Sequence, residues 1–237
     1  MKKLLMLLVV AVFLSGCQSV AGDAAAAQAV LAKVTQPEER TVAYFDQDWA
    51  LSAQPDPNGF YRKVYGKTAD GHYIAQDFYA SSQTKQTDPF EVIAEAGLTV
   101  GDNSYNTGTI VWYDVNGTKT GKQVYQNGLY TGEMESYYPN GKVKFRSELA
   151  ADRQGKVVTA FYENGQAMSV VRKDQCDDWI DMRTWYDNGQ QSGELTFSGD
   201  LVAKGWDRNG KALPEDALGE HFALIFVDVV AIEPEIY

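Results

Sequence analysis

Asn-Gly pairs recur at a constant step along the second half of the chain, and this repeat constrains the fold more than any other feature. The pairs stand at 116–117, 140–141, 164–165 and 188–189, which are 24 residues apart. Asn-Gly favours a two-residue hairpin turn because both turn positions take positive φ. The same step is kept by apolar residues (Ile110, Met134, Val158, Met182) and by aromatic residues (Tyr113, Tyr137, Phe161, Trp185). The sequence therefore predicts a series of antiparallel hairpins.

Each 24-residue unit also contains a second turn position. Asn127-Gly128 and Gly199-Asp200 lie three units apart, and Gln175-Cys176 falls in a slot between them. Two strands and two turns fit in 24 residues, because strands commonly run about 5–6 residues. Residues 107–212 are therefore predicted to form an antiparallel meander of stacked β-hairpins, and the chain as a whole is expected to be mostly β. The register places Cys176 in a turn, where we expect an exposed, non-catalytic thiol.

The segments outside the repeat give weaker patterns. Residues 41–106 mix aromatic β-formers with turn residues and predict a smaller N-terminal β or α+β portion. Within it we expect strands over Phe60–Tyr65 and His72–Tyr79 and a short helix over Pro89–Leu98. Residues 213–237 are expected to form a C-terminal strand or cap.

Three hexapeptides of the repeat resemble the bacterial variant of the MORN repeat, which is often labelled antitoxin-like. They are Tyr137-Tyr138-Pro139-Asn140-Gly141-Lys142, Phe161-Tyr162-Glu163-Asn164-Gly165-Gln166 and Trp185-Tyr186-Asp187-Asn188-Gly189-Gln190. The resemblance covers about residues 107–212. It implies a meandering sheet of hairpins, and it implies no catalytic residue, because the family has no shared active site.

The first residues carry an export signal. Lys2 and Lys3 precede an apolar run, Leu4–Leu14, and Ser15-Gly16-Cys17 follows directly. The run is too short to span a bilayer, which needs roughly 20 apolar residues. A basic start, a short apolar stretch and small residues before a cut describe a signal peptide, here residues 1–16. The end of the run resembles the bacterial lipobox, which implies that Cys17 is acylated with fatty chains such as palmitate. Gln18, in place of aspartate, implies sorting to the outer membrane.

Beyond the signal peptide, the lipid anchor and the acidic charge limit the partners. Residues 17–40 are expected to contain the lipidated cysteine and a tether or a short helix, which Asp23 would cap and which would run through Val34. The chain without its signal peptide is acidic. Lys2 and Lys3 are lost from the 21 basic side chains, which leaves 19 basic and 32 acidic residues. Such a chain does not hold nucleic acid by neutralising phosphates.

The sequence offers few groups for catalysis, and we expect no enzymatic activity, no cofactor and no metal. The two histidines, His72 and His221, have no metal-ligand spacing. Glu133 and Glu135 share a strand face and are the residue types of an acid–base pair, but pairs at this spacing are common by chance. Four aspartates surround Cys176 and are interpreted as a solvated loop rather than a cation site. They are Asp174, Asp177, Asp178 and Asp181.

The aromatic column of Tyr113, Tyr137, Phe161 and Trp185 is the one candidate binding platform. It is interpreted either as cross-strand packing or as a surface for a protein partner or a glycan. We expect an outer-membrane lipoprotein that uses the repeat sheet for protein–protein contact, with an antitoxin or immunity-like role as the version that the resemblance implies. A periplasmic glycan or peptidoglycan binder is the second class of function, and a hydrolase is the third and least favoured. The sequence leaves open which face of the outer membrane carries the protein.

Overall fold

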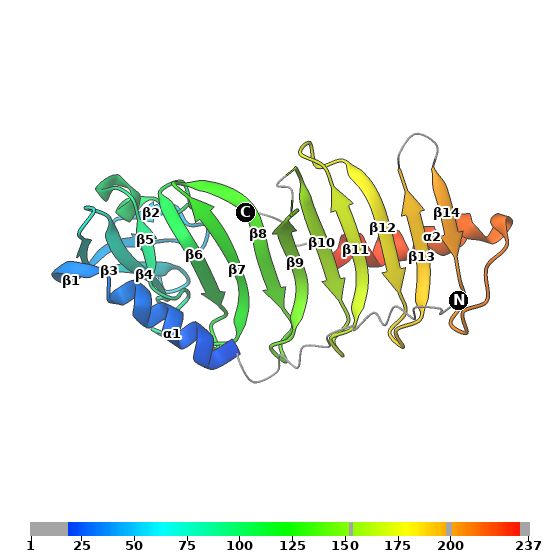
Figure 1. Ribbon diagram of the computed structural model, residues 1–237. Helices are drawn as coiled ribbons and strands as arrows, with labels where there is room; N and C mark the ends of the chain where they lie inside the picture. Colours follow the sequence, from blue (N-terminus) through cyan, green and yellow to red (C-terminus); the bar gives the residue numbers. More distant parts are fainter. Residues whose placement is uncertain (1–18, 152–153, 198–200, 233–237) are drawn as a thin grey trace.

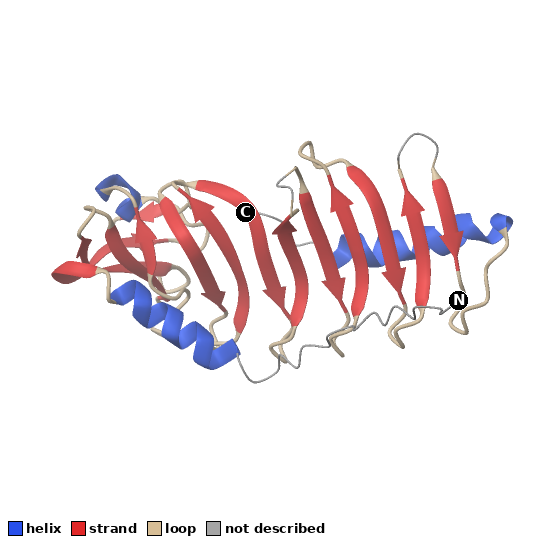
Figure 2. Ribbon diagram, viewed as in Figure 1, coloured by secondary structure: helices blue, strands red, loops and turns tan. Residues whose placement is uncertain are grey.

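The computed structural model describes residues 19–151, 154–197 and 201–232. Within these residues, fourteen strands form one antiparallel sheet in which sequence neighbours pair, except at one edge where β1 lies between β2 and β3. Figure 2 shows the strands side by side along an elongated sheet with two longer helices beside it. The expectation of a mostly β antiparallel meander is therefore confirmed.

The elements before the repeat are α1 (Ser19–Leu31), β1 (Val34–Phe45), β2 (Leu51–Ser52), β3 (Phe60–Thr68), β4 (Tyr73–Tyr79), β5 (Phe90–Val92) and the 3₁₀ helix η1 (Glu95–Thr99). The strands of the repeat are β6 (Asn106–Tyr113), β7 (Lys119–Gln126), β8 (Leu129–Tyr137), β9 (Val143–Leu149), β10 (Lys156–Phe161), β11 (Ala167–Lys173), β12 (Trp179–Trp185), β13 (Gln191–Thr196) and β14 (Val202–Gly205). The helix α2 (Glu215–Ile232) follows them.

The N-terminal strands continue the repeat sheet without a break. Strands β3 and β4 form where the sequence predicts them. The single helix predicted over Pro89–Leu98 is wrong, because that segment contains β5 and the start of η1. Strand β5 pairs with β6 through Glu91 opposite Thr107 and Val92 opposite Asn106, so the sheet runs across the 106/107 boundary.

The repeated Asn-Gly pairs form a different turn from the one predicted. In the turn after β8, the Gly141 N–H donates to the Tyr138 carbonyl and the Tyr138 N–H donates to the Lys142 carbonyl, both at 2.8 Å. Gly141 has φ 79°, whereas Asn140 is not among the residues with positive φ. This is a three-residue loop, a type I turn followed by a left-handed glycine. Only Asn127-Gly128, with φ of 51° and 82°, has both positions in the conformation of the expected two-residue turn.

The repeated asparagine and tyrosine side chains join one repeat to the next. Asn140, Asn164 and Asn188 donate from Nδ2 to turn carbonyls of the following unit, at Glu163, Asp187 and Arg208 (3.4, 2.8 and 3.3 Å). Tyr138, Tyr162 and Tyr186 donate from their hydroxyls to the carbonyls of Phe161, Trp185 and Trp206 (2.7, 2.9 and 2.9 Å). The 24-residue pattern therefore persists because each unit satisfies backbone acceptors of its neighbour.

One face of the sheet, called here the inner face, carries the core. Register places one row of residues on this face: Ile110, Gln123, Met134, Ser147, Val158, Val171, Met182, Leu195 and Ala203. Met182 and Leu195 are fully buried there. Helix α2 covers this row toward β14, where the Phe222 ring packs into the cluster. The absence of a side chain at Gly193 makes room for the Phe222 ring, because a Cβ at this position would lie 2.6 Å from it.

The two long helices lie on opposite faces of the sheet. Figure 1 shows α1 in front of the N-terminal strands and α2 behind the C-terminal ones. Helix α1 begins before Asp23, so this residue does not cap it and instead forms an ion pair with Lys119 at 2.7 Å. The helix also ends at Leu31, and Val34 already belongs to β1. The strand alternative for residues 213–237 is wrong, because Pro214 and the acidic first turn of Glu215 and Asp216 start a helix instead.

Among the described residues, neither helix is long and apolar enough to cross a membrane.

The left-handed turn glycines give a direct test of the repeat. Gly165 has φ 91°, and a Cβ placed there would meet only the end of the Lys142 side chain. Gly165→Val is expected to lower the free energy of unfolding by about 1–3 kcal/mol, from backbone strain rather than from a clash. Urea unfolding would measure it against Gln166→Val, which places the same side chain next door without a positive φ. Equal losses in the two variants would contradict the assigned turn.

Candidate functional site

The face opposite the core, called here the open face, carries a row of alternating charge. Register aligns Lys122, Glu135, Arg146, Thr159, Val170, Arg183, Glu194 and Lys204 across eight strands. Lys122 Nζ lies 3.0 Å and Arg146 Nε lies 2.8 Å from the Glu135 carboxylate. Near the other end, Arg183 and Lys204 each lie 3.8 Å from the Glu194 carboxylate. The charges on this face are therefore mostly matched across neighbouring strands.

Glu135 is the most strongly held of these carboxylates. Burial opposes its charge, but hydrogen bonds from Tyr137 and Lys122 and the charges of Lys122 and Arg146 outweigh burial and lower its pKa. The Tyr137 hydroxyl donates to Glu135, and burial together with this carboxylate raises the tyrosine pKa. Glu135 is thus kept ionised at neutral pH, which suits a structural ion pair and not the acid of an acid–base pair with Glu133.

The structure places the predicted aromatic column on the open face, at the edge that carries the Asn-Gly turns. Tyr113, Tyr137, Phe161 and Trp185 are the last residues of β6, β8, β10 and β12. Because β7, β9 and β11 separate these strands, neighbouring rings lie about 10 Å apart. The column is therefore a row of separate rings and not one continuous stack.

The two ends of the column differ in accessibility. Tyr113 is 9% exposed, and its hydroxyl donates to Asp88 while Lys85 Nζ lies 3.6 Å from its ring centroid. Tyr137 lies under Lys119, whose Nζ is 4.3 Å from that ring. Phe161 and Trp185 are half-buried, farther from α1 along the sheet. Tyr113 is therefore the buried end of the column, whereas Tyr137, Phe161 and Trp185 are all half-buried, with the Arg146 guanidinium 5.8 Å from the Phe161 ring centroid.

Of the other residues that the sequence singled out, Cys176 and the two histidines lie apart from the aromatic column. Cys17 lies outside the described residues. Cys176 is exposed in the turn between β11 and β12, as its register predicts. His72 Nδ1 lies 2.6 Å from Glu91, and His221 Nε2 lies 2.7 Å from the Ser192 carbonyl on a different part of the sheet. The two histidines are thus in separate structural contacts.

The aspartates around Cys176 already have protein partners. Asp174 accepts the N–H groups of Cys176 and Asp178. Asp177 pairs with Lys156 at 2.7 Å, and Asp181 pairs with Arg172. Among the described residues, no group of three or more His, Cys, Asp or Glu side chains is arranged to hold a metal ion.

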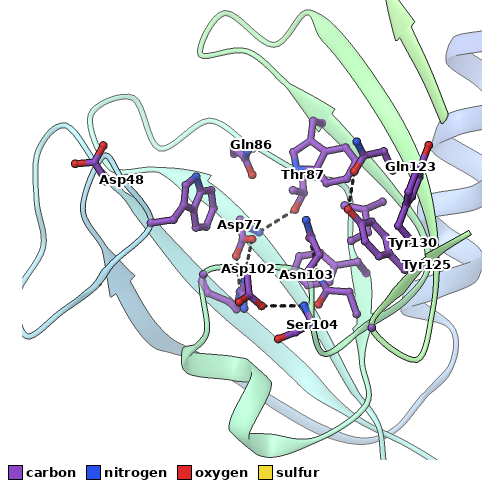
Figure 3. Close-up of a pocket in the computed structure, with 18 of the residues that line it drawn as sticks. Asp48, Asp77, Gln86, Thr87, Asp102, Asn103, Ser104, Gln123, Tyr125 and Tyr130 are labelled. Carbon is purple, nitrogen blue, oxygen red and sulfur yellow. Dashed lines mark hydrogen bonds and ion pairs between the residues drawn. The ribbon is translucent and has the colours of Figure 1, made fainter. Parts of the chain in front are cut away.

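A cavity in the N-terminal half was missed by the sequence reasoning. It is a hollow of about 1130 Å³ beside the inner face, with Trp112, Gln123, Tyr125 and Tyr130 among its lining residues. Its other side consists of two loops, which contribute Asp48 and Trp49 after β1 and Gly101–Ser104 after η1. Figure 3 shows Asp102, Asn103 and Ser104 on one loop, between Asp77 and the neighbouring rings of Tyr125 and Tyr130. These residues come from distant parts of the chain, so spacing alone gave no signal.

Comparison with protein families matches one hairpin of the sheet. The model of the MORN repeat variant matches residues 130–148, which contain most of β8, the Asn140-Gly141 turn and most of β9. No curated protein matches the chain. The other repeat hairpins keep the aromatic pair and the Asn-Gly turn of the matched one at the 24-residue step. Residues 130–148 and the hairpins that repeat their pattern are therefore similar to the MORN repeat variant.

Proposed function

We propose that this protein is an outer-membrane lipoprotein, anchored through acylated Cys17, that binds a protein partner on the open face of β8–β14 and catalyses no reaction. The observation that carries the proposal is the contrast between the two faces. The inner face holds the core and is covered by α2, whereas within the described residues no helix lies over the C-terminal half of the open face.

The charge of the open face suits contact with a protein. The whole chain has a net charge of −11. On the open face, however, the basic Lys122, Arg146, Arg172, Arg183 and Lys204 stand beside the acidic Glu135, Glu148, Asp181 and Glu194. A charge-balanced surface avoids the repulsion that the rest of this acidic chain imposes, and its fixed pattern of charges gives specificity.

Aromatic side chains beside these charges supply apolar contact area. Half-buried Phe161 and Trp185 lie at the turn edge of the charged rows. Aromatic residues and arginine are enriched in the residues that dominate binding energy at protein interfaces. The resemblance to antitoxin-like repeats suggests one version of the function, in which the partner is a toxin neutralised at the envelope.

A photo-crosslinking amino acid introduced at Arg183 tests the surface in intact cells. One discrete protein adduct is expected from position 183 and none from Leu224, an exposed side chain on α2. Trp185→Ala is expected to weaken binding of the captured protein about tenfold, because interface aromatics commonly contribute at this level. Leu224→Ala serves as the matched control. Adducts at both positions, or unchanged binding in Trp185→Ala, would contradict an interface on the open face.

A further inference from the structure

We propose that the N-terminal cavity binds an uncharged oligosaccharide. The proposal does not rest on the protein interface, since the cavity adjoins the inner face and the interface is on the open face. A volume of about 1130 Å³ is slightly above the usual range of about 300–1,000 Å³ for ligand sites, which is enough for a few sugar rings.

The lining supplies aromatic rings for the apolar faces of sugars. Trp49, Trp112, Tyr125 and Tyr130 all line the cavity. The Tyr125 and Tyr130 rings lie 6.0 Å apart at 54°. The faces of aromatic rings carry partial negative charge and attract the weakly positive C–H groups of a pyranose ring.

The polar groups at the cavity are mainly amides that can bond to hydroxyl groups. Asn106 Nδ2 donates to Asn103 Oδ1 at 2.8 Å, and the Tyr125 hydroxyl donates to Gln123 Oε1 at 2.6 Å. Burial raises the pKa of Tyr125, so its hydroxyl keeps its proton. Amide side chains both donate and accept, as sugar hydroxyls do, and therefore suit neutral polar ligands.

The charges at the cavity disfavour anions. Arg62 is the cation in the lining, and the Asp77 carboxylate already neutralises it through two bonds of 2.7 and 2.9 Å. Asp48 and Asp102 add negative charge, and both are exposed to water rather than enclosed around a bound ion. A hydrogen bond from Ser104 lowers the pKa of Asp102, which keeps that carboxylate ionised. These features favour a neutral ligand over a phosphate or a carboxylate.

Trp49, at the edge of the cavity, has a positive φ that is unusual for a bulky residue. The turn at Asp46 has the same hydrogen bonds as those at Asp114 and Asp207, in which the first carboxylate accepts two N–H groups. Those two turns place glycine in the left-handed position, at Gly117 and Gly210. The equivalent turn at Asp174 places Asp177 there with φ 70°, whereas the turn at Asp46 places the much bulkier Trp49 there with φ 63°. A bulky side chain at positive φ is strained, and such strain is commonly retained at ligand sites.

The Trp49 ring packs against two aromatic neighbours, one of which is Phe45, with ring centroids 5.3 Å apart and an angle of 43°. The Trp49 ring also stacks on Phe60, with ring centroids 4.3 Å apart and an angle of 10°. The same side chain also lines the cavity. The ring is therefore held by both Phe45 and Phe60 at the border of the cavity, and a rigid ring there suits stacking against a sugar.

Calorimetric titration of the intact protein with tetrasaccharides of N-acetylglucosamine, β1,4-linked glucose and α1,4-linked glucose tests the proposal. At least one of the three tetrasaccharides is expected to bind to the protein. Trp49→Gly is expected to weaken that binding at least about tenfold, equal to about 1.4 kcal/mol. The substituted turn would have the glycine that its hydrogen bonds favour, so folding is expected to persist. Trp49→Tyr keeps a ring and should retain most of the affinity, and Trp185→Ala on the open face should retain all of it.

Three results would overturn the proposal. The first is failure of all three sugars to bind at concentrations up to about 10 mM. The second is binding that Trp49→Gly leaves unchanged, which would place the sugar elsewhere. The third is saturable binding of spermidine without binding of any sugar, which would make the cavity a cation site. None of these results bears on crosslinking from position 183, so the two proposals can fail separately.

Discussion

Arg62→Met is expected to lower the free energy of unfolding of the N-terminal half by about 3–5 kcal/mol, because it leaves a buried carboxylate without its partner. The Arg62 and Asp77 side chains are 2% and 4% exposed. The guanidinium also donates to the carbonyls of Gly97 and Val100, both at 2.9 Å, and lies 5.2 Å from the Phe45 and Phe90 ring centroids. Methionine fills part of this volume but supplies none of these hydrogen bonds.

Hydrogen exchange by segment is the suitable measurement, because a long sheet of repeats can lose protection locally. Protection should fall in β1–β5 and much less in β10–β14. The control is the pair Arg62→Met with Asp77→Leu, which removes both charges and should restore at least about 2 kcal/mol of the loss. The double variant is expected to remain less stable than wild type, because the carbonyls of Gly97 and Val100 lose their hydrogen-bond donor. A single variant as stable as wild type would show that the ion pair does not stabilise this half.

The repeat made the sheet predictable, but it did not make the turn type predictable. A 24-residue step with alternating side chains determines strands of matching length, and β8–β13 follow it. The sequence predicts a backbone role for Asn140, because Asn-Gly is the usual pair of a two-residue turn. In the structure, the Asn140 side chain instead donates a hydrogen bond to the Glu163 carbonyl in the next repeat unit. That role depends on the neighbouring turn lying alongside, which period and composition do not specify.

Helix α2 could have been predicted from its start. Pro214, Glu215 and Asp216 form a recognised beginning for a helix. The apolar residues that follow are rich in β-branched and aromatic types, and short apolar runs do not distinguish a buried strand from a helix. The glycine at 193, opposite the Phe222 ring, shows its packing role only once α2 is in place.

The cavity was less predictable than either of these features. Alternation along Phe60–Thr68 places Arg62 on the same face as Val64, and a charge there is understandable only once Asp77 is found on the next strand. Trp49 and Asp102 are brought together by loops that the repeat does not describe. A comparison of the turns that begin with aspartate would have shown Trp49 in the position that Gly117 and Gly210 occupy in two other turns, although not what it lines.

Cys17→Ala is expected to abolish acylation entirely, since it removes the thiol that the lipobox resemblance assigns to the diacylglyceryl group. The variant should incorporate no labelled palmitate and should keep residues 1–16, because the lipobox resemblance implies that the signal is cut in front of an acylated cysteine. Cys176→Ala is the matched control, because it removes the other cysteine of the chain, which is exposed in a turn. It should be labelled and cut as wild type is. Normal palmitate incorporation in Cys17→Ala would refute the anchor and leave the two binding proposals in place, since each rests on residues of the folded sheet.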